Sequence, residues 1–344
     1  MNTLFRNALL AATALAGLAA AGCSGSSAPI PAPNLNSAPA GLSAHTNPSP
    51  TPVPLNFTTV DSPGSTTFNK VLDINELGVI VGTDGTGTAS DPSNGYDSSP
   101  PYTKFNALNY PGALDTVSAG LSSSRYKTGY FVDRSKGHHT WGFVKDRGIW
   151  TLYKDTKAPN GPGCTTALLG INVSGQAVGY YIDINGNKQA TELTVSNRHF
   201  SGFHPPGAVS ATANGINQRG DVVGTETLGN GVTEGWLMRD GAYLQLVYPN
   251  AVSTQALGLN FDDDIVGSYT DVSGGTHGFI LIHPNPSKEF WQSVDEPNAA
   301  GYTVLTSNNS HHAFTGWYVD SQGNTHGFVA NAKQGGSGSA RPVR

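Results

Sequence analysis

Residues 257–279 read Leu-Gly-Leu-Asn-Phe-Asp-Asp-Asp-Ile-Val-Gly-Ser-Tyr-Thr-Asp-Val-Ser-Gly-Gly-Thr-His-Gly-Phe. This segment predicts three short strands joined by two tight turns, the first over Phe261–Asp263 and the second over Asp271–Gly274. The middle strand, Ile265–Tyr269, has a glycine at its centre. Copies of this unit, some of them eroded, recur along the chain, and the repeat therefore decides the fold.

Four sequence markers recur in a fixed order. The glycine at the centre of the middle strand returns at intervals of 43 to 50 residues, as Gly82, Gly129, Gly179, Gly224, Gly267 and Gly316. Seven residues before it, a polar residue begins the first turn: Asn75, Ser122, Asn172, Asn217, Asn260 and Asn309. Eleven residues after it comes a small residue, followed in three of four copies by Phe or Trp: Ala190, Gly235, Gly278 and Gly327. The second copy has this feature displaced by two, and the first copy is read as lacking it. A Pro-Gly-Ala-like corner separates the copies, with its proline at Pro63, Pro111, Pro162, Pro206, Pro249 and Pro297.

The middle strand places adjacent apolar residues, such as Val222-Val223, on opposite faces of its sheet, so both faces must be covered. Thin sheets that stack face to face would cover both, and the central glycine is predicted to let the neighbouring sheet approach closely. The pattern predicts an all-β, six-bladed β-propeller of four-stranded blades over residues 57–333. The segment Phe57–Pro63 matches the strand before the other corners, and the chain ends without one. The N-terminal strand is therefore predicted to complete the last blade and close the ring. An open β-solenoid is the alternative.

The N-terminus predicts export. Residues 1–22 contain one charge, Arg6, and an apolar run that is too short for a permanent membrane helix, as in a signal peptide. Ala20-Ala21-Gly22-Cys23 resembles a bacterial lipobox, which implies lipid attachment at Cys23; a plain signal peptide is the alternative. Residues 23–56 form a Pro/Ser/Ala-rich linker, and residues 334–344 are predicted to be a disordered tail. The predicted location is the outer membrane, with the domain in the periplasm or at the cell surface.

The repeat resembles a known family. The run Gly-Ile-Asn-x-x-Gly-x-x-Val-Gly-Tyr-Tyr at residues 170–181, the Asp-x-x-Gly loops, the two Thr-His-Gly-Phe runs and the Pro-Gly-Ala corners are similar to those of the HAF-repeat proteins. These are extracellular repeat proteins of bacteria. The resemblance covers most of residues 57–330, with the first two copies eroded. It implies an exported repeat protein and no established reaction.

Composition narrows the function classes. The 344 residues carry a formal net charge of −5 with no basic stripe, which gives nucleic-acid binding no electrostatic support. Pairing with Cys23 is not expected, so Cys164 is predicted to be a small buried hydrophobe. The body contains no Gly-x-Ser-x-Gly elbow, phosphate-binding loop or Cys-x-x-Cys pair, and we predict no catalytic residues and no cofactor.

Several His and Asp residues are candidate metal ligands, but each also has a structural explanation. His277 and His326 occupy matching places and are predicted to hydrogen-bond neighbouring loops. The pairs His138-His139 and His311-His312 are adjacent, so on a strand their side chains would point apart. The Asp262–Asp264 run and the Asp183 loop lack the EF-hand spacing and are predicted to be Asx turns. No metal site is predicted.

The first copy carries an insertion at residues 83–101 that contains Asp84, Asp91, Tyr96 and Asp97. A long loop on a rigid ring suits ligand binding, and these four residues form the predicted binding loop; mobile filler is the alternative. The predicted function is a lipid-anchored binding or scaffold module for a glycan or a protein, without catalysis. The alternative function is a polysaccharide hydrolase or lyase at the mouth of the propeller.

Overall fold

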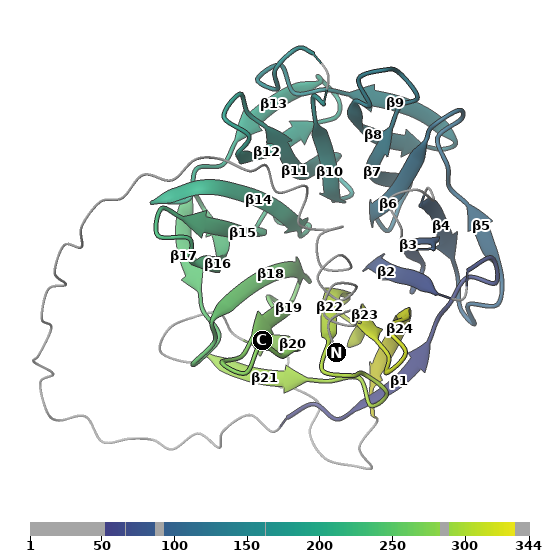
Figure 1. Ribbon diagram of the computed structural model, residues 1–344, viewed down its shortest axis with the longest axis vertical. Helices are drawn as coiled ribbons and strands as arrows, with labels where there is room; N and C mark the ends of the chain where they lie inside the picture. The colour runs from purple at the N-terminus through teal and green to yellow at the C-terminus, as the bar shows by residue number, and fades with distance from the viewer. Residues whose placement is uncertain (1–51, 66, 87–92, 162, 283–288, 334–344) are drawn as a thin grey trace, which may run out of the picture.

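The computed structural model describes residues 52–65, 67–86, 93–161, 163–282 and 289–333. These residues form β-strands joined by turns, and the sheets stand around a central axis (Figure 1). The prediction of an all-β protein with a β-propeller arrangement is confirmed.

Four of the sheets in the described residues contain four strands each, every strand antiparallel to its neighbours. The second copy comprises β6 (Asp115–Leu121), β7 (Tyr126–Val132), β8 (Thr140–Asp146) and β9 (Ile149–Tyr153). The third comprises β10 (Thr166–Ile171), β11 (Gln176–Ile182), β12 (Lys188–Thr194) and β13 (His199–Gly202). The fourth comprises β14 (Ala208–Ile216), β15 (Val222–Leu228), β16 (Thr233–Arg239) and β17 (Ala242–Leu246). The fifth comprises β18 (Ser253–Leu259), β19 (Ile265–Thr270), β20 (Thr276–Ile282) and β21 (Phe290–Val294).

The remaining sheet has eight strands and contains the first and last copies of the repeat. The last copy supplies β22 (Thr303–Asn308), β23 (Ala313–Val319) and β24 (Thr325–Ala332), and the first supplies β2 (Phe68–Ile74), β3 (Ile80–Gly85), β4 (Asn94–Ser98) and β5 (Phe105–Ala107). One parallel pair, Phe68 with Thr325, joins the two groups. The N-terminal strand β1 (Leu55–Thr59) lies antiparallel to β24, and the Phe57 and Phe328 rings pack edge to face with centroids 5.3 Å apart.

The prediction of six separate four-stranded sheets is therefore wrong in number, since four sheets of the described residues stand alone. The first and last copies share one sheet because the backbone of β2 reaches that of β24 at Phe68. For the same reason the N-terminal strand does not complete a separate sixth sheet. It pairs with β24 inside the eight-stranded one, and it begins at Leu55.

The polar side chain that begins each first turn links neighbouring copies. The Nδ2 group donates to the backbone oxygen at the equivalent position of the next copy, over 3.0 to 3.4 Å, from Asn75 to Ser122, Asn172 to Asn217, Asn217 to Asn260, Asn260 to Asn309 and Asn309 to Asn75. The Oδ1 atom of Asn309 also accepts hydrogen bonds from the backbone of His311 and Ala313 within its own turn. Because the last of these five links joins the final copy to the first, the open solenoid is excluded.

Ser122 leaves a gap in this series of links. Its Oγ accepts a hydrogen bond from the backbone of Tyr126 at 3.1 Å, as an asparagine Oδ1 would, but a serine lacks the amide NH₂ group that donates to the next copy from the other turns. We expect Ser122→Asn to complete the series and to raise the free energy of unfolding by about 1 kcal/mol, the usual net value of one buried hydrogen bond. Urea denaturation measures this change. Ser124→Asn, at an exposed position of the same turn, is the control, and a destabilised Ser122→Asn protein would contradict the prediction.

The strand-centre glycines have a different role from the predicted one. A Cβ on Gly267 would lie 1.9 Å from the Gln255 oxygen and 2.8 Å from the Phe279 ring, and both residues belong to its own sheet. The neighbouring sheet approaches the later glycine instead, since a Cβ on Gly278 would lie 3.0 Å from Leu305. In five of the described copies the glycine of the middle strand therefore makes room for an aromatic ring on the next strand of the same sheet. In the third copy the atoms nearest to a Cβ on Gly179 all belong to the backbone.

Candidate functional site

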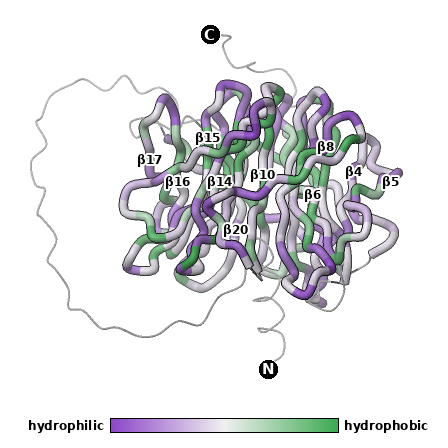
Figure 2. Tube along the Cα trace, turned by 90° about the horizontal axis from the view of Figure 1, so that it is seen from above, coloured by the Kyte–Doolittle hydropathy of each residue, from purple (hydrophilic) through white to green (hydrophobic). Residues whose placement is uncertain are grey.

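The ring has two faces on which side chains are presented. Successive strands of a sheet are antiparallel, so the turns between first and second strands lie on one face and the hairpins between second and third strands lie on the other. We call them the amide face, after Asn75 and its equivalents, and the hairpin face, which contains Asp183, Asp271 and Asp320. Figure 2 shows the hydrophobic residues along the strands and the hydrophilic ones gathered in the turns at both ends.

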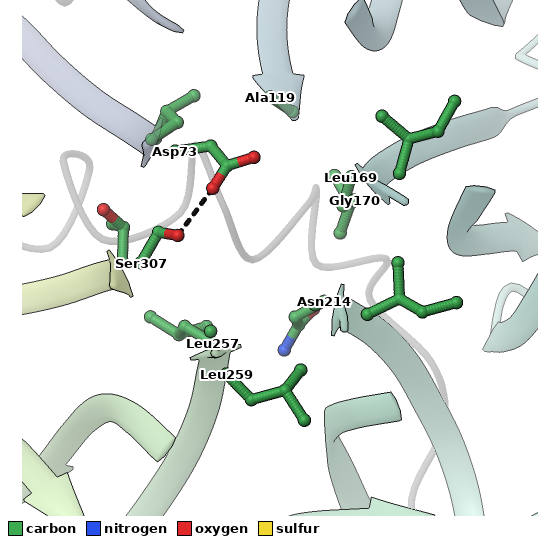
Figure 3. Close-up of a pocket in the computed structure, with 14 residues that line it drawn as sticks. Asp73, Ala119, Leu169, Gly170, Asn214, Leu257, Leu259 and Ser307 are labelled. Atoms are coloured by element: carbon green, nitrogen blue, oxygen red, sulfur yellow. Dashed lines mark hydrogen bonds between the residues drawn. The ribbon is translucent and has the colours of Figure 1, made fainter. Parts of the chain in front are cut away.

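The first strands meet on the axis around a cavity of about 40 Å³ (Figure 3). A β-bulge in each first strand turns one residue toward it, and these residues are Leu72, Ala119, Leu169, Asn214, Leu257 and Thr306. Ligand pockets usually have volumes of about 300–1,000 Å³, so this cavity holds a few water molecules at most. A sugar ring does not fit within the channel.

Asp73 is the charged residue among those that line the cavity. Its carboxylate accepts a hydrogen bond from Ser307 Oγ at 2.5 Å (Figure 3). It also accepts one from the Leu121 backbone at 2.8 Å. Burial raises the pKa of Asp73 to about 6, against the opposing effect of these hydrogen bonds. The group ties the last copy to the first and the first to the second, so its role is explained by the closure of the ring.

Three of the four residues of the predicted binding loop lie in strands rather than in a loop. Asp84 lies at the end of β3, and Tyr96 and Asp97 lie in β4, where all three are buried. Asp97 accepts hydrogen bonds from Lys127 at 2.7 Å and from Asn106 at 2.9 Å, which fixes it between the first two copies. Asp91 lies outside the described residues. The insertion shifts the third strand along the chain, and Asp84, Tyr96 and Asp97 are part of the sheet.

Tyr96 is the missing aromatic residue of the first copy. It pairs with Gly82 just as Phe279 pairs with Gly267, and its hydroxyl donates to the Lys70 oxygen at 3.1 Å. The preceding Gly95 completes the Gly-aromatic pair that the sequence interpretation did not find. The displacement by two residues that Gly142-Phe143 shows in the second copy was the signal that could have located it.

His277 and His326 are structural, as predicted, and each lies between two carboxylates on the hairpin face. His326 contacts Asp61 through Nδ1 at 2.7 Å and Asp320 through Nε2 at 3.2 Å. His277 contacts Asp295 at 2.8 Å and Asp271 at 3.3 Å in the same way. Burial lowers the pKa of both imidazoles, but the hydrogen bonds to the carboxylates outweigh it and the pKa of each is raised.

The raised pKa values predict a pH-dependent stability. A doubly protonated imidazole can donate to both carboxylates, whereas a neutral one can donate to only one. The folded pKa lies above the unfolded value near 6.5, so the stabilisation is complete below that value and is lost as the pH rises through the folded pKa. We expect the free energy of unfolding of the wild type to fall over that range.

His326→Gln tests this expectation. In the third copy Gln189 occupies the equivalent place and donates to Asp183 at 2.9 Å, so the substitution keeps one hydrogen bond. We expect His326→Gln to remove about half of the pH slope, and the double variant with His277→Gln to remove most of it. Urea denaturation at several pH values measures the slope. The exposed His199→Gln is the control, and an unchanged slope in the double variant would refute the assignment.

Of the aspartates that suggested calcium, Asp183 forms an Asx turn, as predicted, whereas in the Asp262–Asp264 run the turn is made by Asn260, whose Oδ1 accepts the backbone N–H of Asp264. Asp183 Oδ1 accepts the backbone N–H groups of Asn185 and Asn187, both at 2.9 Å. The hydrogen bond from the Gly275 backbone helps to lower the pKa of Asp271 in the same geometry. Asp263 contacts Arg219 and Arg239. Within the described ranges, no group of three His, Cys, Asp or Glu side chains is placed to hold a metal ion.

The adjacent histidines also have structural contacts. His139 lies 3.2 Å from Asp133, and His311 lies 3.2 Å from Glu76. Their neighbours His138 and His312 adopt positive φ angles of 46° and 57° in turns. Cys164 is a buried free cysteine, as predicted.

Sequence reasoning missed a pair of glutamates on the hairpin face. Glu226 on β15 lies directly opposite Glu234 on β16. Glu234 accepts a hydrogen bond from Gln245, and Glu226 is 4% exposed. The signal was present, because Glu226 and Glu234 stand two and ten residues after Gly224, where the fifth copy has Tyr269 and His277 after Gly267.

The predicted signal peptide at 1–22, the predicted lipid attachment at Cys23, the predicted linker up to residue 51 and the predicted tail at 334–344 lie outside the described residues. In the part that the structure describes, no helix has the length and apolar character needed to cross a membrane.

Comparisons with known proteins do not identify a family. No protein-family model matches the chain, and no curated protein matches it either. Among solved structures, TolB from Acinetobacter baumannii is similar at 12% identity with a TM-score of 0.47, over 75% of this chain and 64% of TolB. The chain thus spans less than two thirds of that protein.

Two further structures are similar at the same level. YCF48 bound to D1 peptide matches at 13% identity with a TM-score of 0.40, over 81% of this chain and 86% of that one. A mutant of the Aleuria aurantia lectin AAL in complex with Fucalpha1-6GlcNAc matches at 8% identity with a TM-score of 0.45, over 79% of this chain and 93% of the lectin.

Proposed function

We propose that the chain is an exported, lipid-anchored binding module of the HAF-repeat type that acts without catalysis. The two halves of the eight-stranded sheet, β22–β23–β24–β1 and β2–β5, would act as two blades joined at one residue pair, which makes a ring of six units. Lipid at Cys23 and the linker would hold this ring away from the outer membrane, in the periplasm or at the cell surface.

One observation carries the binding function. A repeated framework holds a different side-chain pair at one equivalent place on the hairpin face in most copies. The pairs are Asp84–Asn94, Phe131–Trp141, Tyr181–Gln189, Glu226–Glu234, Tyr269–His277 and Tyr318–His326. In the second, third, fifth and sixth copies the hairpin beside the pair is fixed by an Asx turn, made by Asp133, Asp183, Asp271 and Asp320. The second residue of each pair is at least partly exposed, so it is presented on rigid backbone, which reduces the entropy cost of binding.

The ligand class remains a glycan or a protein, and the alternative remains a polysaccharide hydrolase or lyase. A panel of glycans and peptides, assayed both for retention and for released product, separates them. We expect retention without product. Release of product would replace the binding proposal by the enzymatic one, and neither retention nor release would leave a purely structural surface protein.

The anchor is tested separately, because it does not depend on the ligand. Cells given radiolabelled palmitate should label the chain, and Cys23→Ser should abolish the label. Label that survives Cys23→Ser would refute lipid attachment at this cysteine.

A further inference from the structure

The fourth copy contains two carboxylates without a cation. Glu226 and Glu234 lie opposite each other, and like charges in directly opposed strand positions repel. Neither glutamate takes part in any ion pair within the ranges that the structure describes. Glu234 accepts a hydrogen bond from the neutral side-chain amide of Gln245.

Glu226 is the more deeply buried of the two glutamates. It is 4% exposed, and its Oε2 atom is buried without a hydrogen-bond partner among the described residues. An unpaired buried carboxylate oxygen costs more free energy than folding usually tolerates, unless a ligand supplies the missing donor. Burial and the proximity of Glu234 raise the pKa of Glu226, which is the response expected of a carboxylate that lacks a cation.

The fifth and sixth copies show what the fourth copy lacks. There an imidazole from the third strand lies between two carboxylates, as His277 does between Asp271 and Asp295. In the fourth copy Glu234 replaces the histidine, and Val247 stands where the fifth copy has Asp295. The arrangement of charges is therefore inverted relative to the fifth copy. In the fourth copy the two strands supply two carboxylates, and neither strand supplies a cation at this place.

We propose that Glu226 and Glu234 bind a primary ammonium group carried on an aliphatic stem. The three N–H donors of an ammonium group match the unpartnered Glu226 Oε2 and the remaining acceptor sites of Glu234. Val232 and Val247 are both exposed and stand two residues from Glu234 and from Gln245, just outside β16 and β17, where they can contact the stem. This inference rests on the proposed binding function and gives it a site and a ligand chemistry, met by a lysine side chain or by a polyamine.

The test uses the full chain and three probes: n-butylammonium, Nα-acetyl-lysine amide and spermidine. Binding is followed by the NMR shifts of the Trp236 indole N–H, because Trp236 follows Glu234 by two residues on the same side of β16 and is fully buried. We expect saturable shifts with at least one probe, and at least a tenfold loss of affinity in Glu226→Gln and in Glu234→Gln. Asp240→Asn removes one negative charge from an exposed turn on the amide face of the same sheet and should bind like the wild type.

The probes also separate the two sources. Tighter binding of the lysine amide assigns the site to a protein partner, and tighter binding of spermidine assigns it to a polyamine. Equal binding by wild type and both glutamine variants would overturn the inference, as would displacement of all three probes by Ca²⁺ at equal concentration. If the ligand panel shows retention that neither glutamine substitution alters, the binding function stands and this site alone is refuted.

Stability without ligand gives a second readout. Since the buried Oε2 atom of Glu226 has no hydrogen-bond partner among the described residues, we expect Glu226→Gln to raise the melting temperature of the unliganded chain while it abolishes ammonium binding. A lower melting temperature would mean that the carboxylate has an internal structural role, and would overturn the inference. Glu234→Gln, whose side chain is only half-buried, should change the melting temperature less.

Discussion

Gly267→Ala is expected to destabilise the protein by about 4 kcal/mol or more, a large part of the roughly 5–15 kcal/mol by which most single domains are stable. The new Cβ would lie 1.9 Å from the Gln255 carbonyl oxygen, which is backbone on the neighbouring strand of the same sheet and cannot rotate away. On its other side the Cβ would meet the buried ring of Phe279 at 2.8 Å. The strand would have to separate from its neighbour, and the bulge before it would be lost.

The control for this prediction is Gly64→Ala. A Cβ there would have Ser62 Oγ at 3.9 Å as its nearest neighbour, so the change should be close to neutral. Urea denaturation and the yield of soluble protein measure both variants. If the free energy of unfolding of Gly267→Ala were within about 1 kcal/mol of the wild-type value, the contacts with Gln255 and with the Phe279 ring would not require a glycine at this position.

Val60→Asp is expected to lower the free energy of unfolding by about 3–5 kcal/mol, because it buries an unpaired charge where the first and last copies of the repeat meet. Val60 is 3% exposed, and its backbone N–H donates to the Gly327 oxygen at 2.8 Å. Its side chain belongs to a buried cluster with Val71 of the first copy and Val329 of the last copy. The substitution therefore weakens both the strand pairing and the contact between the two copies.

Thr58→Asp is the matched control, since Thr58 is an exposed residue of β1 and its substitution should cost little. The free energy of unfolding and the rate of proteolysis near the N-terminus report the difference. If Val60→Asp were as stable as Thr58→Asp, the N-terminal segment would contribute nothing to holding the last copy against the first.

The repeat made the candidate site only partly predictable. The Asx-turn role of Asp183 and the structural role of His277 follow from local spacing, because both side chains bond groups within a few residues or across one hairpin. The sequence did not show that the insertion at residues 83–101 contains a displaced strand. Tyr96 and Asp97, which were predicted to lie in a loop, are buried residues of that strand. The glutamate pair was missed because two glutamates eight positions apart show nothing unusual until a hairpin places them side by side.

The sequence by itself determined the repeat, its turns and the all-β architecture, because each of these depends on interactions between residues that are near in the chain. The tertiary structure decided which copies share a sheet and where the Asn309 amide goes, since it finds its acceptor at Asn75, in the first copy of the repeat. It also decided that Glu226 has no counter-ion among the residues that the structure describes. Such contacts depend on how whole sheets pack against each other, and a pattern with a period of two residues contains no information about that geometry.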